Sequence, residues 1–127
     1  MLMDIDRFKE INDTLGHLAG DKVIREFTAR LNRFVRRIDL IGRFGGDEFM
    51  VMLSHKTGHQ AGIVAERLKK AMKRPVDFED RKINVSFSMG IVEIKGDENL
   101  DMNQLLKIAD QALYEAKSKG GNQYILR

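Results

Sequence analysis

The sequence predicts a single α/β or α+β domain in which helices pack on a central β-sheet. The chain has 127 residues, enough for one compact domain with its own core. Hydrophobic residues make up 43% of the chain and charged residues 32%, a balance typical of soluble globular proteins. Segments with the two-residue period of strands alternate with segments of helical period, in the order β–α–β–β–α–β–α–β.

The composition also argues against several classes of protein. The chain contains no cysteine, which excludes disulfides and thiolate metal sites and fits a reducing compartment. We expect no membrane span, which needs about 20 apolar residues, and no signal peptide, because Asp4 and Asp6 interrupt the apolar start. The net charge is +3, and the basic stretches 30–37 and 67–74 interleave with apolar residues at helical spacing. That spacing favours solvated helix faces over a nucleic-acid-binding surface.

The first third of the chain predicts a strand followed by helical segments. The opening "MLMDIDRF" is an apolar strand that turns acidic, and a short helical turn and a loop around Gly16 and Gly20 follow it. From Asp21 to Ile38 the apolar residues recur with a 3.6-residue period, which predicts an amphipathic helix. Asp21 then stands at the helix N-terminus, where a carboxylate can cap free N–H groups.

The middle of the chain predicts a β-hairpin, in which "GGDE" connects "DLIGRF" to "FMVMLS". Gly45 and Gly46 tolerate the positive φ angles that tight turns use. The strand over residues 49–53 is apolar throughout, so we expect both of its faces to be covered.

The second half predicts two more helices and two more strands. A helix over Gly58–Lys73 is expected to pack through Ile63, Val64, Leu68 and Met72 and to stop before Pro75. "KINVSFSMGIVEI" alternates as a strand, in which Gly90 marks a bulge or a close backbone approach. Asp101 can cap a third helix that Gly120 and Gly121 end, and "QYIL" is a short final strand.

Acidic residues gather where two of these elements end. Asp4 and Asp6 follow the first strand, and the hairpin offers Asp47 and Glu48. If the strands are neighbours, three or four carboxylates converge, and without cysteine the cation that suits such oxygen ligands is Mg²⁺ or Mn²⁺. Gly45 and Gly46 would let a phosphate or a base approach the backbone. This pattern favours metal-dependent phosphoryl or nucleotidyl transfer, while a solvated strand end and an ordinary exposed turn remain the simpler alternatives.

Four sequence blocks resemble one known family. "RFGGDEF" from Arg43 carries the signature of the GGDEF family, the diguanylate cyclases. "DIDRFKEINDTLGHLAGD" from Asp4, "SMGI" from Ser88 and "ADQALYEAKSKGGN" from Ala109 are similar to the family's other landmarks, in order and at fitting separations. The resemblance implies a mostly antiparallel sheet flanked by helices, similar to the adenylyl cyclase and polymerase palm core. It also implies that a homodimer condenses two GTP molecules into cyclic di-GMP and releases pyrophosphate.

The family's catalytic positions can be matched to this chain one by one. Asp4 and Asp47 match the metal-binding acids, the backbone carbonyl of Ile5 helps to hold the metal, and two Mg²⁺ or Mn²⁺ ions are expected per site. Glu48 matches an acid that either activates the attacking hydroxyl or binds another metal. Lys9 and Lys117 would contact phosphates, while an Asp such as Asp21 suits the N–H donors of guanine. The substrate-binding positions implied in this way are Phe8, Lys9, Asn12, Asp21, Gly45, Gly46 and Lys117.

The resemblance also implies an inhibitory product site. "RRID" places Arg36 and Asp39 in the family's pattern of Arg, any two residues, then Asp, and Arg67 matches a further product-contacting arginine. Arginine can bind phosphate or a guanine edge bidentately, and Asp can accept from guanine N–H groups. Without the resemblance, this segment is simply an exposed helix end of mixed charge.

Two departures leave an alternative function open. Gly121 stands where many members carry arginine, so we expect weaker GTP binding, with Lys119 as a substitute cation. The usual "LTGLPNR"-like start is absent, so we expect residues 1–127 to be an N-terminally truncated GGDEF domain from a larger signalling protein that is cytoplasmic or has a cytoplasmic portion. The alternatives to an active cyclase are a non-catalytic GTP or cyclic di-GMP sensor and an interaction domain. No nucleic-acid or membrane contact by this segment is expected.

Overall fold

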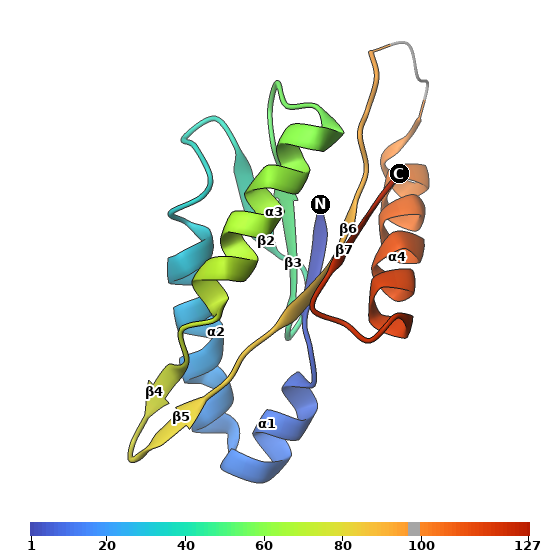
Figure 1. The fold of residues 1–127 in the computed structure, drawn as a ribbon. Helices are drawn as coiled ribbons and strands as arrows, with labels where there is room; N and C mark the ends of the chain where they lie inside the picture. Colours follow the sequence, from blue (N-terminus) through green and yellow to red (C-terminus); the bar gives the residue numbers. More distant parts are fainter. Residues whose placement is uncertain (97–99) are drawn as a thin grey trace.

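The structure is a computed structural model that describes residues 1–96 and 100–127. Its central sheet has five strands in the order β2-β3-β1-β6-β7, and a separate two-stranded sheet pairs β4 with β5. Figure 1 shows α2 and α3 on one side of the central sheet and α4 on the other. Along the chain the elements are β1 (Leu2–Ile5), α1 (Phe8–Leu15), α2 (His17–Leu31), β2 (Leu40–Arg43), β3 (Glu48–Met52), α3 (Gly58–Met72), β4 (Val76–Phe78), β5 (Arg81–Ile83), β6 (Phe87–Ile91), α4 (Met102–Ser118) and β7 (Tyr124–Leu126).

The predicted fold class is confirmed. β1 pairs antiparallel with β3 and β6, β2 pairs antiparallel with β3, and only β7 runs parallel to its neighbour, β6. This arrangement makes β1 the central strand, so its C-terminal end lies beside both the hairpin and the start of β6. Among the described residues, no helix is both long and apolar enough to cross a membrane.

The main core lies between the sheet and the α2–α3 layer. Alternate residues of β1 enter it, because Met3 and Ile5 are buried there while Leu2 packs on the α4 side. Phe27 of α2 lies with its ring centroid 4.8 Å from that of Phe49 and 5.2 Å from that of Phe87. These contacts fix α2 against β3 and β6, the strands on either side of β1.

α4 covers the opposite face at very short range, as the glycine in β6 predicts. A Cβ at Gly90 would lie 2.0 Å from the carbonyl oxygen of Ala109 and 2.7 Å from the amide nitrogen of Leu113. Pairing of Leu2 with Gly90 is in regular register, so the glycine marks a close approach and not a bulge. The predicted cap is also confirmed, since the Asp101 side chain accepts from the Gln104 amide.

The predicted boundaries of α2 were wrong. The helix begins at His17 and ends at Leu31, so Asp21 lies inside it and caps nothing. Gly20 is also helical and not part of a loop, because α1 packs directly against it. Phe34 and Val35 pack on the core from the turn after the helix, so their apolar spacing extended the predicted helix too far.

The structure differs from the prediction in two further respects, the burial of α3 and β3 residues and the division of one predicted strand. Ile63 of α3 and Met52 of β3 are exposed, so Ile63 is off the packed face and β3 is not covered throughout. The strand predicted from Lys82 is divided into β5 and β6, since residues 84–86 belong to neither. The predicted alternation is nevertheless confirmed, because Ile83, Val85, Phe87, Met89 and Ile91 all belong to the main core.

Candidate active site

Strand register brings the predicted acids to one edge of the sheet. Asp4 of β1 is the direct antiparallel partner of Glu48 of β3, so their side chains lie on the same face. The amide of Ile5 donates to the carbonyl oxygen of Asp47 at 3.2 Å, which fastens the hairpin to the end of β1. Glu48 therefore lies in a strand rather than in the turn where the sequence placed it.

Lys117 supplies the opposing charge. Its Nζ lies 2.7 Å from Oδ2 of Asp4, and it reaches this carboxylate from the last turn of α4. Burial raises the pKa of Asp4, and the negative charges of Asp47 and Glu48 raise it further, whereas Lys117 lowers it. A nearly buried carboxylate is thus held between one cation and two like charges.

The signature turn is braced by an arginine that sequence reasoning did not single out. The Arg43 guanidinium donates to the carbonyl oxygens of Gly45, at 3.1 Å, and Gly46, at 2.6 Å. Neither glycine adopts positive φ, so the conformational reason predicted for them was wrong. A Cβ at Gly45 would lie 2.6 Å from Oε2 of Glu48, so a side chain there would displace the end of the Glu48 side chain. The only sequence signal for Arg43 was its position beside the signature.

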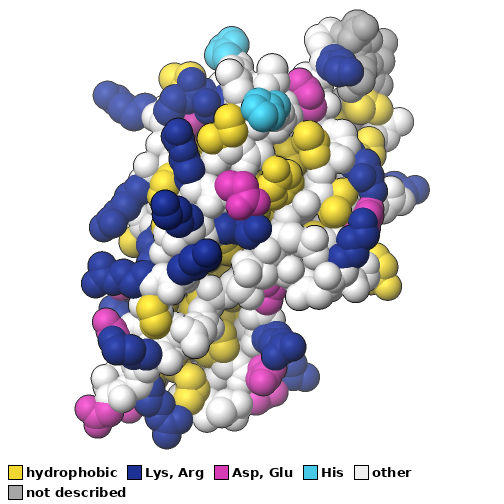
Figure 2. All heavy atoms as spheres, viewed as in Figure 1, with side chains coloured by type: hydrophobic (Ala, Val, Ile, Leu, Met, Phe, Trp, Pro, Cys, Tyr) yellow, Lys and Arg dark blue, Asp and Glu magenta, His cyan; other side chains and the backbone are white. Residues whose placement is uncertain are grey.

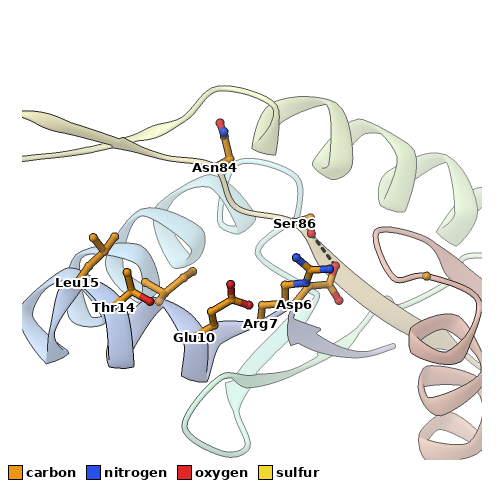
Figure 3. Close-up of a pocket in the computed structure, with 9 residues that line it drawn as sticks. Asp6, Arg7, Glu10, Thr14, Leu15, Asn84 and Ser86 are labelled. Carbon is orange, nitrogen blue, oxygen red and sulfur yellow. Dashed lines mark hydrogen bonds between the residues drawn. The ribbon is translucent and has the colours of Figure 1, made fainter.

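Asp6 does not join the predicted carboxylate cluster. Its carboxylate accepts hydrogen bonds from the hydroxyls of Ser86 and Ser88, both at 2.7 Å, and from the amide of Asn122 at 2.9 Å. Figure 3 shows the Ser86 bond at the edge of a hollow between α1 and the segment that leads into β6. These long-range partners had no sequence signal.

The donor set at the strand edge fits a hard divalent cation by its chemistry. Asp4, Asp47 and the Ile5 carbonyl offer oxygen ligands of the kind that Mg²⁺ and Mn²⁺ prefer, with Glu48 alongside. In the described part of the chain, no three acidic or histidine side chains are already grouped closely enough to hold a metal ion. Lys117 provides the positive charge that Asp4 contacts in this arrangement.

The positions matched to guanine recognition lie where α1 meets α2. A Cβ at Gly20 would lie only 1.9 Å from Oδ1 of Asn12 and 3.2 Å from Cζ of Phe8, so Asn12 rests directly on this turn of α2. Asp21 follows Gly20 and is exposed, as is Lys9 in the first turn of α1. The glycine therefore allows Asn12 to reach the part of α2 that carries Asp21.

A hollow on α1 is distinct from these positions. Its volume is about 500 Å³, and neither Lys9 nor Asn12 lines it. Polar and apolar residues share the wall, and Figure 3 shows Glu10 and Arg7 projecting from α1 and its start. The polar lining residues are Asp6, Arg7, Glu10, Thr14, Asn84 and Ser86.

The residues matched to a product site form a closed ion pair in this structure. Arg36 Nη2 lies 3.1 Å from Oδ1 of Asp39, whose carboxylate also accepts from the amides of Arg36 and Ser54. The bonds from the Arg36 side chain are the main reason that the pKa of Asp39 is lowered to about 2. Asp39 has a side chain that is 0% exposed, so every partner it has here belongs to the protein.

Arg67 is an exposed residue of α3. It lines a hollow of about 730 Å³ together with Lys69, Lys70 and Lys73. Figure 2 shows that Lys and Arg side chains gather over this part of the molecule. Neither Arg36 nor Asp39 lines this hollow.

Comparisons of this chain with known proteins identify the same family. The family described as "Diguanylate cyclase, GGDEF domain" matches residues 1–123. Diguanylate cyclase A of Treponema denticola is 39% identical over 99% of the chain, and the cyclic di-GMP phosphodiesterase NbdA of Pseudomonas aeruginosa is 36% identical over 96%. The chain spans 34% of the first relative's length and 16% of the second's.

A solved structure agrees with the sequence relatives. The GGDEF domain of TpbB, also called YfiN, from Pseudomonas aeruginosa superposes with a TM-score of 0.91 at 36% identity. The match covers 98% of this chain and 73% of that one. Together with the paired acids at the strand edge, these matches show that the chain belongs to the GGDEF domain family of diguanylate cyclases.

Proposed function

We propose that this domain condenses two GTP molecules into cyclic di-GMP, with release of two pyrophosphates. The observation that carries the proposal is the pairing of Asp4 with Glu48, beside Asp47 and Lys117. Like charges placed directly opposite one another are unfavourable in a sheet, so their presence at a strand end points to a cationic partner. A Mg²⁺- or Mn²⁺-bound triphosphate is such a partner, and two ions per site is the proposed number.

The proposed substrate-binding residues lie in two regions, one for the guanine base and one for the triphosphate. Asn12 and Asp21 read the guanine edge, because an Asp accepts from N–H donors that the Watson–Crick edge of adenine lacks. Phe8, Lys9 and Lys117 lie beside the triphosphate, to which the two lysines offer positive charge, and Gly45 leaves room near the base. When bound, the divalent ions polarise the α-phosphate and stabilise the leaving group.

The bond changes are those of nucleotidyl transfer. The 3′-hydroxyl oxygen of each GTP attacks the α-phosphorus of the other, and the bond from that phosphorus to the bridging oxygen breaks. Pyrophosphate leaves with the bonding electrons, and the hydroxyl proton passes to a carboxylate or to solvent. Glu48 either takes this proton or binds a second ion. One domain supplies one GTP, so the proposal requires two copies of the chain facing each other.

Product inhibition is the regulatory part of the proposal. Arg36, Asp39 and Arg67 are the proposed contacts for cyclic di-GMP, and Arg36 retains an exposed guanidinium edge. Because the Asp39 side chain is buried against Arg36 and Ser54, a ligand that uses this carboxylate must first open the ion pair. Arg36→Ala should weaken inhibition while leaving initial turnover intact, and equal inhibition of variant and parent would contradict this site.

The direct test is to incubate the concentrated protein with GTP and Mg²⁺ and to separate the nucleotides. Cyclic di-GMP and pyrophosphate should form in a metal-dependent reaction, and Asp47→Ala should abolish both. Asp80→Asn, in the remote β4–β5 turn, is a control that should retain activity. If GTP binds and no product forms with metal present, the second candidate, a non-catalytic nucleotide sensor, is favoured. Gly121 is the observation behind that candidate, since it removes a cation expected at the phosphates.

A further inference from the structure

Asp6 is the second acid of "DID", to which the proposed chemistry gives no role, and its side chain joins three segments that are distant along the chain. It follows β1, and its partners Ser86 and Ser88 belong to the entry into β6. Its third partner, the Asn122 amide, lies in the turn between α4 and β7. All three donors point at one carboxylate, so the side chain acts as a junction within the protein.

The turn that Asp6 holds has an unusual backbone. Gly120, Gly121 and Asn122 have φ angles of 104°, 72° and 52°, so three successive residues adopt the left-handed region. Asn122 is the one member of this run with a side chain, and left-handed residues other than glycine need support from their surroundings. The bond from the Asn122 amide to Asp6 is 2.9 Å long and supplies such support.

Close packing reinforces the same contact. A Cβ at Gly121 would lie 3.1 Å from Oδ1 and 3.2 Å from Oδ2 of Asp6. The absence of a side chain at residue 121 therefore lets the turn lie directly against the carboxylate. Ser88 is fully buried, so this arrangement is anchored in the sheet on its other side.

Two of the three segments joined by Asp6, the end of β1 and the turn after α4, lie next to the two members of the Asp4–Lys117 ion pair. Asp4 lies on β1, two residues before Asp6. In the turn, the Gly120 amide donates to the carbonyl oxygen of Lys117 at 3.1 Å. Displacement of the turn would thus move the end of α4 from which Lys117 reaches the active-site edge. The position of Lys117 relative to Asp4 depends on what fastens the turn to β1.

We propose that Asp6 is a positioning residue that binds neither metal nor substrate. It holds the 120–122 turn against the end of β1 and so places Lys117 for the nucleotide phosphates. The second statement rests on the proposed function, whereas the first concerns the fold alone. Asp6 already has three protein donors, whereas Asp4 pairs with Lys117 and lies opposite a second acid, Glu48.

The test compares Asp6→Ala and Asp6→Asn with the parent in the full chain. Amide hydrogen exchange at Asn122 reports on the turn without any need for activity. Affinity for a fluorescently labelled GTP, the KM for GTP and the Mg²⁺ concentration for half-maximal effect report on the site. Asp101→Ala is the matched control, because it weakens α4 through its N-cap at the opposite end from Lys117.

In Asp6→Ala we expect amide exchange at Asn122 to accelerate. The Kd for labelled GTP and the KM for GTP should each rise by about tenfold, because a charge-assisted hydrogen bond is lost. The Mg²⁺ requirement should stay unchanged. Asp6→Asn keeps one acceptor oxygen, so its effects should be smaller, and Asp101→Ala should lower the melting temperature without raising KM.

Other outcomes would overturn the assignment. A raised Mg²⁺ requirement that excess Mg²⁺ relieves would make Asp6 a metal ligand. Unchanged exchange at Asn122, or a lower melting temperature with parental nucleotide affinity, would remove the positioning role. If the parent binds labelled GTP but forms no cyclic di-GMP, the proposed function fails, while the exchange and affinity measurements still decide the role of Asp6.

Discussion

Asp4 and Glu48 are direct cross-strand partners at the edge of the sheet where β1 meets the signature hairpin. Their carboxylates share a face with Lys117, which contacts only Asp4 among the recorded ion pairs of the described residues. Directly opposed like charges destabilise a strand pair by roughly 0.2–1 kcal/mol. The repulsion between these carboxylates therefore lies at the place where we propose that the metal-bound substrate binds.

The free-energy cost of this charge repulsion can be measured with Glu48→Gln. The substitution keeps the shape of the side chain and removes one of the two opposed charges, so unfolding should require about 0.5 kcal/mol more free energy. Cyclic di-GMP formation should fall sharply in the same variant, because both proposed roles of Glu48 need a carboxylate. Urea unfolding and a turnover assay would be run in parallel, with Asp80→Asn as the remote control. A variant with lower stability than the parent would contradict the repulsion argument.

The second prediction is that alanine in place of Gly20 should lower the stability of the protein, although Gly20 lies inside a helix. Alanine normally stabilises a helix interior relative to glycine by up to about 1 kcal/mol. In Gly20→Ala the new Cβ would meet Oδ1 of Asn12 at 1.9 Å and Cζ of Phe8 at 3.2 Å, so these two side chains of α1 must shift. We expect lower stability and a several-fold higher GTP KM, together with a weaker preference for GTP over ATP.

Gly42→Ala is the matched control for this clash, since a Cβ at Gly42 has no neighbour within 4 Å. Comparing GTP and ATP turnover in both alanine variants separates the packing effect from a general effect of glycine replacement. Asp21→Ser should reduce the same nucleotide preference without moving α1. An unchanged GTP-to-ATP ratio in Asp21→Ser would count against its role as the guanine reader.

Asp39 predicts a definite pH dependence of stability. Its pKa is lowered from 3.8 to about 2 in the folded protein, chiefly by the Arg36 side chain. A lowered folded-state pKa stabilises the protein above the unfolded value, and the contribution disappears as the pH falls from about 4 to about 2. The urea midpoints of the parent and Asp39→Asn should therefore differ most above pH 4 and converge toward pH 2. A difference that grows on acidification would refute this assignment.

Local patterns were sufficient to predict much of the fold. β1, the hairpin and α4 were recoverable because apolar periodicity, turn glycines and a capping aspartate all lie within a few residues of the elements they define. The acids of the site were also visible, since Asp4 and Asp47 stand at strand ends. Their pairing could be inferred only from β1 and β3 being neighbours, which the register establishes.

The features that escaped prediction depend on contacts between distant residues. The start of α2 was missed because Gly20 looks like a loop residue until Asn12 packs against it. The partners of Asp6 are 80, 82 and 116 positions away along the chain, beyond the reach of any local pattern. Short strands such as β4 and β5 carry too few residues for a period to be recognised.

Arg30 supplies the last prediction, which separates folding from function. Its guanidinium is largely buried and donates to the carbonyl oxygens of Arg74, at 2.5 Å, and Pro75, at 3.2 Å, just beyond α3. Arg30→Met should leave those carbonyls without this donor and lower the free energy of unfolding by about 2 kcal/mol. Arg33 is exposed and lines a surface hollow together with Arg30, so Arg33→Met should change the free energy of unfolding by less than about 0.5 kcal/mol. Turnover per folded molecule should stay at the parental value in both variants, because the contacts of Arg30 are with Glu26 and residues 71–75 and not with the proposed site residues. A thermal unfolding scan gives the first comparison, and a kcat lowered at a temperature where Arg30→Met is fully folded would show that this arginine reaches the active site.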